Sequence, residues 1–138
     1  EVLYIPAGGT AIPVTPEKLV THDNTMRMKG KEIFKVAVKT LADFATQALA
    51  ANGLTVKDLD WFVPHQANLR IIEAVAKRMD FPMERVLTNV ERYGNTSAAT
   101  VPTVLDEAVR SGKVKPGQTL LMDVFGAGLT YGSLLMRW

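Results

Sequence analysis

Two short polar segments hold the side chains of this chain that are best suited to chemistry. In WFVPHQANLR, an apolar run ends at a proline, and His65, Gln66 and Asn68 follow at once. In ERYGNTSAAT, a glycine precedes Asn95 and a run of small hydroxyl residues. An imidazole can donate or accept a proton near neutral pH, and a carboxamide donates hydrogen bonds without titrating. If both segments face one pocket, His65 and Asn95 could together hold an oxygen on which negative charge develops.

Each of these features also has a plainer explanation. A loop histidine is more often satisfied by main-chain hydrogen bonds, and Gly-Asn-Thr-Ser before a helix is what N-capping favours. Ser97 is interpreted as a helix cap, because no Gly-x-Ser-x-Gly elbow surrounds it. The link Gly126-Ala127-Gly128 is either a hairpin turn or a place where a main-chain N–H meets a substrate oxygen. The two histidines, His22 and His65, lack metal-ligand spacing, so no metal site is expected.

Four basic residues could form an interaction surface. Arg70 and Lys77 lie seven residues apart on one predicted helix face. Arg78 flanks them, and Lys35 lies on the preceding predicted helix. The simpler interpretation is a solvated basic face, and the functional one is a dock for an acidic partner.

Predicted helices alternate with buried strands, which indicates an α/β domain with a mixed sheet. Residues 1–29 are rich in Pro, Gly and Thr, and we expect a short extended piece and a long loop there. Apolar periodicity predicts helices over 31–51, 68–79 and 96–111, the last with Pro102 in its first turn. Strands are expected over 61–63, 119–125 and 129–137, with a short strand at 86–88 and a turn or short helix at 56–59. The polar segments and the glycine-rich link then follow strand ends, where sites gather in such sheets.

Length and composition narrow the class of protein. With 138 residues, 47% hydrophobic, 22% charged and a net charge of +2, the chain fits one globular domain with no sign of a nucleic-acid partner. It has no cysteine, hence no disulfide and no thiol nucleophile of its own. No apolar run approaches the ~20 residues of a membrane span, so no membrane partner is expected. The chain begins with Glu1 rather than Met and runs directly into EVLYIPAGG, which suggests an entry partway through a longer protein.

The paired motifs resemble one known family. PHQANLRII, with the asparagine of GNTSAA thirty residues after its histidine, strongly resembles the C-terminal half of β-ketoacyl-acyl-carrier-protein synthase III. The resemblance continues through DEAVRSGKVKPGQTLLMDVFGAGLTYGSLLMRW and back through KGKEIFKVAV, so it covers essentially the whole chain. It implies a thiolase-like αβαβα layered fold with a mixed sheet and flanking helices, of which residues 1–138 would be the C-terminal half. The family's cysteine nucleophile would lie in an N-terminal half that this chain does not contain.

The resemblance also implies an activity. Family members perform a decarboxylative Claisen condensation of acyl-CoA with malonyl-acyl-carrier protein, which starts fatty acid synthesis. No cofactor is held permanently, and the substrates are a coenzyme A thioester and a phosphopantetheine-linked malonyl group. We expect an acyl carrier protein as partner, a cytoplasmic homodimer for the complete enzyme, and no condensation by this chain without the Cys-bearing half.

Site residues follow from the resemblance position by position. His65 and Asn95 would be catalytic, and the Ala127 N–H would belong to the oxyanion hole. Contacts to the coenzyme A or pantetheine arm are expected from Gly30, Phe34, Ala67 and Asn68. Carrier-protein contacts are expected from Lys35, Gln66, Arg70, Lys77 and Arg78. Family members commonly have three glycines where this chain has Gly126-Ala127-Gly128, so the added methyl leaves the acyl-chain preference open.

Two other functions stay open on the sequence. The absence of cysteine is also what a non-catalytic carrier-protein-binding subunit on the thiolase fold would show. A related condensing enzyme of polyketide or secondary metabolism would keep the same donor pair with another acyl pocket.

Overall fold

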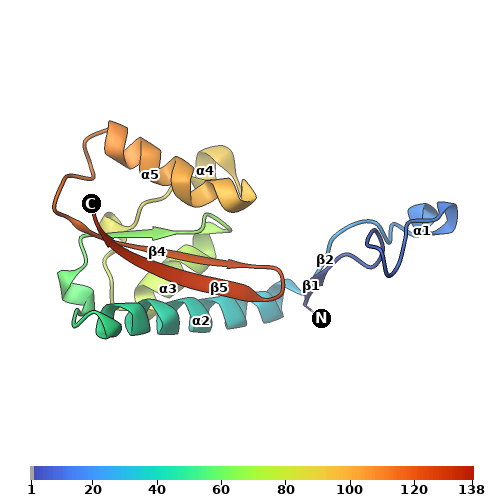
Figure 1. Cartoon of the computed structure of the whole chain (residues 1–138), viewed down its shortest axis with the longest axis horizontal. Helices are drawn as coiled ribbons and strands as arrows, with labels where there is room; N and C mark the ends of the chain where they lie inside the picture. Colours follow the sequence, from blue (N-terminus) through green and yellow to red (C-terminus); the bar gives the residue numbers. More distant parts are fainter. Residues whose placement is uncertain (1) are drawn as a thin grey trace.

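The computed structural model describes residues 2–138, which form a packed body and an N-terminal arm extending away from it (Figure 1). The arm carries strand β1 (Leu3–Tyr4), helix α1 (Pro16–Val20) and strand β2 (Arg27–Met28). The helices of the body are α2 (Gly30–Ala51), α3 (Leu69–Arg78), α4 (Val90–Tyr93) and α5 (Thr100–Arg110). Its strands are β3 (Trp61–Pro64), β4 (Thr119–Gly126) and β5 (Thr130–Arg137), and single 3-10 turns lie at Val56–Asp58, Met83–Arg85 and Ser97–Ala99.

The body is built on a three-stranded sheet in the order β3-β4-β5, and its mixed character agrees with the prediction from the sequence. Strand β3 runs parallel to β4, with Pro64 opposite Asp123, and β4 forms an antiparallel hairpin with β5. Because β3 and β4 are parallel, their carboxyl ends point to the same edge of the sheet. The residues that follow β3 therefore lie beside the end of β4.

Alternate residues of the strands fill two hydrophobic clusters on opposite faces of the sheet. Phe62 and Leu121 face helices α2 and α3, where they pack against buried alanines and leucines of α2. Val63 and Leu120 face α5, where they meet Val104. Figure 1 shows the resulting layers, with α2 and α3 on one side of the sheet and α5 on the other.

The N-terminal residues are more ordered than the sequence predicted. The expected long loop contains α1, whose first turn is capped by the Thr15 hydroxyl accepting from Lys18 N–H at 3.4 Å. It also returns to pair β2 with β1, Leu3 lying opposite Met28. Two-residue strands and a five-residue helix carry too little periodicity to be recognised from sequence. No helix among residues 2–138 is both long enough and apolar enough to cross a membrane.

Two further local predictions need correction. The expected strand at 86–88 is a single bridge between Val86 and Phe62, because the chain turns away into α4 at once. Ser97 does not cap α5, since that helix begins at Thr100 after its N-cap Ala99, and no side chain of residues 2–138 caps its first turn. Pro102 lies in the first turn of α5, as predicted, where no main-chain N–H is required.

Candidate functional site

His65 is held at the end of β3 by main-chain and side-chain contacts. Its N–H donates to the Asp123 carbonyl of β4 at 2.8 Å, which extends the parallel ladder by one residue. Its Nδ1 lies 2.6 Å from the hydroxyl of Thr100, the first residue of α5. Burial lowers the pKa of the His65 imidazole below its ordinary value, because the charged form loses solvation. A neutral ring with one nitrogen engaged by Thr100 keeps the other nitrogen available to a ligand.

Asn95 follows a turn that only glycine adopts easily. Gly94 has φ +65°, a left-handed value that strains any residue with a Cβ. Asn95 Oδ1 accepts from the Ser97 N–H at 2.9 Å, which fixes the carboxamide with its oxygen turned toward its own loop. The Asn95 NH2 group is then left as the donor end, on an exposed side chain.

The two donors line one cleft, together with most of the residues the sequence singled out. This cleft has a volume of about 1500 Å³. Its lining includes His65, Asn95, Ala127, Gly30, Phe34, Lys35, Ala67, Asn68 and Arg70. Segments more than sixty residues apart in the chain thus meet at the carboxyl edge of the sheet. The sequence did not indicate Lys31, which also lines the cleft and carried no distinguishing pattern.

Two elements shape the mouth of the cleft, the start of α3 and the turn between β4 and β5. Asn68 caps α3, with its Oδ1 accepting from the Arg70 N–H at 2.9 Å. The first-turn N–H groups of α3 lie at this end, and they favour oxygen ligands and negative charge. Ala127 lies in the exposed turn between β4 and β5, and its N–H donates to no main-chain carbonyl among residues 2–138. Main-chain donors therefore approach the cleft from two sides.

Gln66 does not belong to the carrier-protein surface that the sequence predicted. Its side chain is 0% exposed, so no macromolecular partner can reach it. Its amide donates to the carbonyls of Pro64 at 2.7 Å and Leu87 at 3.1 Å, and its oxygen accepts from the Asn89 N–H at 3.0 Å. Gln66 therefore joins the His65 segment to the segment that leads into α4 and Asn95. The sequence did not reveal this role, because the polar residues next to Gln66 are more exposed than Gln66 itself.

A second polar cluster fixes α4 against α5. Glu107 of α5 accepts from the Asn89 amide at 3.0 Å, from Arg92 at 2.8 Å and from the Tyr93 hydroxyl at 2.9 Å. The hydrogen bond from Asn89, followed by those from Tyr93 and Arg92, lowers the pKa of the Glu107 carboxyl. Because α4 ends at Tyr93 and Gly94 is its C-cap, this cluster sets where the Asn95 loop begins.

Asp123 was not recognised from the sequence, although an aspartate within the apolar strand TLLMDVFG is the kind of signal that could have found it. Its side chain is buried on the α2 side of β4, and its Oδ1 accepts from the Ser133 hydroxyl at 2.6 Å. Its Oδ2 has no hydrogen-bond partner among residues 2–138. Burial raises the pKa of the Asp123 carboxyl to about 7, against the lowering effect of the Ser133 hydrogen bond.

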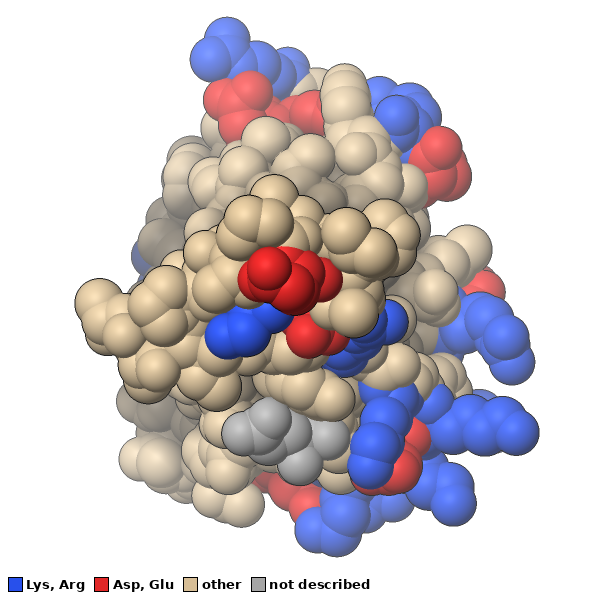
Figure 2. All heavy atoms as spheres, turned by 90° about the vertical axis from the view of Figure 1, so that its right-hand side faces the viewer, with Lys and Arg blue, Asp and Glu red and all other residues tan. Residues whose placement is uncertain are grey.

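The predicted basic surface divides into two parts. Lys35 and Arg70 are exposed at the cleft, whereas Lys77 and Arg78 lie at the other end of α3, outside its lining. Arg78 is engaged with Asp43 of α2 at 3.3 Å. Figure 2, which views the molecule from the side of the arm, shows many of the Lys and Arg side chains of this face toward its lower right, whereas its left side is largely uncharged. Two of the four predicted basic groups thus lie at the cleft, and a joint role for all four stays a prediction.

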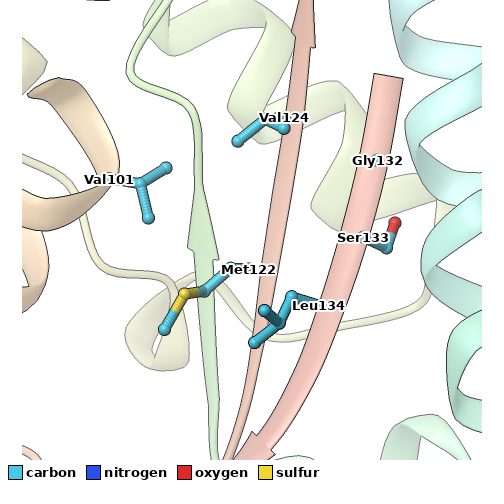
Figure 3. A pocket seen from close by; sticks show the side chains of 6 residues that line it. All are labelled: Val101, Met122, Val124, Gly132, Ser133 and Leu134. Atoms are coloured by element: carbon cyan, nitrogen blue, oxygen red, sulfur yellow. The ribbon is translucent and has the colours of Figure 1, made fainter. Parts of the chain in front are cut away.

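The α5 side of the sheet carries an uncovered apolar hollow of about 340 Å³. Figure 3 shows its labelled side chains: Val101 of α5 faces Met122, Val124 and Leu134 of the hairpin, whereas Ser133 points to the opposite side of the sheet. Val124 and Leu134 are exposed. An apolar surface beside the cleft is a common mark of a protein–protein contact.

Within residues 2–138, no three histidine, cysteine, aspartate or glutamate side chains are grouped so as to hold a metal ion.

Comparison with known proteins identifies the family. A sequence model described as 3-oxoacyl-[acyl-carrier-protein (ACP)] synthase III C terminal matches residues 49–138. The chain is 61% identical over 111 residues to the β-ketoacyl-[acyl-carrier-protein] synthase III of Xanthomonas campestris pv. campestris, which covers 80% of this chain and 34% of that protein. The chain belongs to the β-ketoacyl-acyl-carrier-protein synthase III family.

Solved structures agree with this assignment. The 3-oxoacyl-(acyl carrier protein) synthase III of Pseudomonas aeruginosa PAO1 superposes with a TM-score of 0.86 at 39% identity, over all of this chain and 40% of that one. The priming β-ketosynthase of the R1128 polyketide pathway superposes with a TM-score of 0.78 at 38% identity, over 99% of this chain and 41% of that one. The predicted thiolase-like fold is therefore confirmed. The chain spans about two fifths or less of the length of these relatives.

Proposed function

We propose that this chain supplies the donor pair for decarboxylation in a β-ketoacyl-acyl-carrier-protein synthase III that starts fatty acid synthesis. The observation that carries the proposal is the convergence of His65 and Asn95 on one cleft, where Thr100 contacts the His65 ring and the Gly94 turn leads into Asn95. Family membership supports a condensation as the reaction class, and the cleft contains hydrogen-bond donors suited to such a reaction.

Decarboxylation of a malonyl thioester places negative charge on the thioester oxygen. When CO2 leaves, the electron pair of the broken C–C bond forms an enolate, which needs neutral donors rather than a base. His65 is held neutral by burial, and its nitrogen away from Thr100 can donate to that oxygen. The Asn95 NH2 donates a second hydrogen bond without any change of charge. One preorganised donor of this kind is worth about 3–4 kcal/mol of the barrier.

The substrate arm and its carrier would approach across the mouth of the cleft. Gly30, Phe34, Ala67 and Asn68 line that mouth and would contact the pantetheine arm. Lys35 and Arg70 are exposed beside them and would meet an acidic carrier protein, with Lys77 and Arg78 farther along α3. No cofactor is required, since a coenzyme A thioester and a phosphopantetheine-linked malonyl group bring the reacting carbons. The Ala127 N–H would hold the oxygen of the acyl-enzyme.

The nucleophile would come from a Cys-bearing half that completes the layered fold. We place that half on the α5 side of the sheet, because the apolar hollow of Val101, Val124 and Leu134 lies there beside the cleft (Figure 3). Residues 1–138 would then form the C-terminal domain of the enzyme, inactive in condensation by itself. Family membership further supports a cytoplasmic homodimer for the complete enzyme.

The test reunites this chain with a Cys-bearing half of the family and follows two half-reactions separately. His65→Ala and Asn95→Ala should each slow decarboxylation of malonyl-carrier protein by roughly 10²–10³-fold, since each removes one donor. Transfer of the acyl group from acyl-CoA to the cysteine should change little, and Asn52→Ala, far from the cleft on the α2 cap, should change neither step. Loss of acyl transfer with normal decarboxylation would exclude the proposed roles.

A second candidate function is a carrier-protein-binding subunit without catalysis. The observation that favours it is the absence of cysteine from the chain. It predicts a complex with a carrier protein whose affinity is unchanged by Asn95→Ala and weakened by Lys35→Glu. The polyketide alternative is supported by the likeness to the R1128 priming enzyme, and chain-length preference of the reunited enzyme separates it from fatty acid initiation.

A further inference from the structure

Thr100 is the single side chain within residues 2–138 that makes a hydrogen bond to the His65 ring. It is 1% exposed and begins α5, so its hydroxyl is held in place by both burial and the helix. Its branched Cβ further limits the rotamers available to the hydroxyl. Nothing in the sequence pointed to this contact, because threonine is unremarkable at the start of a helix.

The Thr100 hydroxyl has one proton and two neighbours that could accept it. His65 Nδ1 lies 2.6 Å away, and the Ser97 carbonyl oxygen lies 2.9 Å away. If the proton points to Ser97, the ring must donate from Nδ1, and its Nε2 becomes an acceptor. If the proton points to His65, Nδ1 accepts, and Nε2 carries the ring proton. The direction of one hydroxyl therefore decides which tautomer the neutral ring adopts.

We propose that Thr100 is a positioning residue that donates to His65 Nδ1 and thereby keeps the ring proton on Nε2. The Ser97 carbonyl does not need the hydroxyl, because it already accepts from the Thr100 main-chain N–H. The Nδ1 contact is the shorter of the two, whereas Nδ1 has no other partner among residues 2–138. The proposal rests on the proposed function in one respect: an Nε2–H donor is what the enolate oxygen requires.

The contact also explains how a neutral donor can be maintained without a carboxylate partner. A carboxylate at Nδ1 would fix the same ring nitrogen as a donor and would favour the charged ring. A hydroxyl donor instead favours an unprotonated Nδ1 and adds no charge beside the cleft. The His65 ring is thus oriented by α5 while its main chain is fixed by β4, so two separate elements set one donor.

The test reads the tautomer directly, without substrate or activity. The chain has only two histidines, so ¹⁵N-histidine labelling gives two sets of ring signals, and a His22→Gln variant assigns them. Long-range ¹H–¹⁵N correlation distinguishes a protonated ring nitrogen from an unprotonated one. In the unmodified chain above its ring pKa, His65 should show an unprotonated Nδ1 and a protonated Nε2. A protonated Nδ1 would overturn the proposal, whatever any variant does.

Two substitutions separate the hydroxyl from mere packing. Thr100→Val keeps the branched shape and removes the hydroxyl, so the His65 signals should shift toward a mixture of tautomers. Thr100→Ser keeps the hydroxyl and should retain the original pattern. An unchanged pattern in the Val variant would overturn the proposal. If the Val variant fails to fold, the unmodified chain and the Ser variant still decide, since either one showing protonated Nδ1 refutes it.

Activity then distinguishes this inference from the function on which it rests. In the reunited enzyme, Thr100→Val should slow decarboxylation by roughly tenfold, less than the outright loss of a donor, while Thr100→Ser stays close to the original rate. A tautomer shift with unchanged decarboxylation would support the Thr100 contact and contradict the proposed role of His65. An unchanged tautomer with slowed decarboxylation would contradict the Thr100 contact and leave the proposed function standing.

Discussion

Replacing Asp123 by asparagine should remove a large part of the pH dependence of this protein's stability. The carboxyl is buried against the α2 side of the sheet, and among residues 2–138 only its Oδ1 has a partner, the Ser133 hydroxyl at 2.6 Å. Burial raises its pKa from an ordinary 3.8 to about 7. Between these two values the folded chain keeps a proton that the unfolded chain releases.

The sign and size of the effect follow from this difference. Stability falls as pH rises through the window from about 4 to about 7, because the unfolded state binds fewer protons there. Three pKa units at about 1.4 kcal/mol each give a total of about 4 kcal/mol. Between about pH 5 and about pH 8 the contribution is about 2.5 kcal/mol of unfolding free energy. An asparagine side chain at this position would keep an oxygen for the Ser133 hydroxyl and would not titrate.

The assay is urea unfolding of the unmodified chain and two variants across this range. Asp123→Asn should be more stable than the unmodified chain at about pH 8, by up to about 4 kcal/mol, and the gain should shrink toward about pH 5. Asp80→Asn is the matched control, since Asp80 is exposed and its φ of 56° is one that asparagine accepts. If Asp123→Asn shows the same loss of stability with rising pH as the unmodified chain, the buried carboxyl is not its source.

Three further predictions concern the segments that carry the site. Gln66→Met leaves two main-chain carbonyls and one main-chain N–H without their buried hydrogen-bond partner. It should lower the free energy of unfolding, measured by urea titration, by about 2–4 kcal/mol. As a control, Gln47→Met at an exposed position should lower it far less. The His65 ring, followed by NMR, should titrate below the ordinary histidine pKa of about 6.5. The free energy of unfolding should fall as pH drops below that value, because the unfolded chain binds the proton first. Titration above the ordinary pKa would contradict a desolvated ring. Gly94→Ala should cost about 1 kcal/mol through its φ of +65°, although the added Cβ would have no atom of residues 2–138 within 4 Å. Gly9→Ala should be nearly neutral, and equal effects of the two changes in thermal melts would argue against strain at the Asn95 turn.

The sequence predicted the body of the fold well because its elements are long and regular. Helix α2 was expected over 31–51 and spans Gly30–Ala51, and the closing hairpin was expected within one residue of its ends. Their periodicity reflects burial on one face, which is a local property of the sequence. The arm and α4 were missed because elements of two to five residues depend on contacts made elsewhere in the chain.

The motifs around His65 and Asn95 carried the resemblance to the family, and the alternation of helices and strands predicted the mixed sheet. The roles of His65 and Asn95 as donors stay a prediction. The surroundings of these donors came from tertiary packing alone. Gln66 is buried between the His65 segment and the segment that leads to Asn95, and it bonds to both. Thr100 of α5 contacts the His65 ring although the two residues are thirty-five apart in the chain. The physical reason is that burial and hydrogen-bond partners are set when the elements pack. The type of a polar residue does not reveal whether its side chain will face solvent or the core.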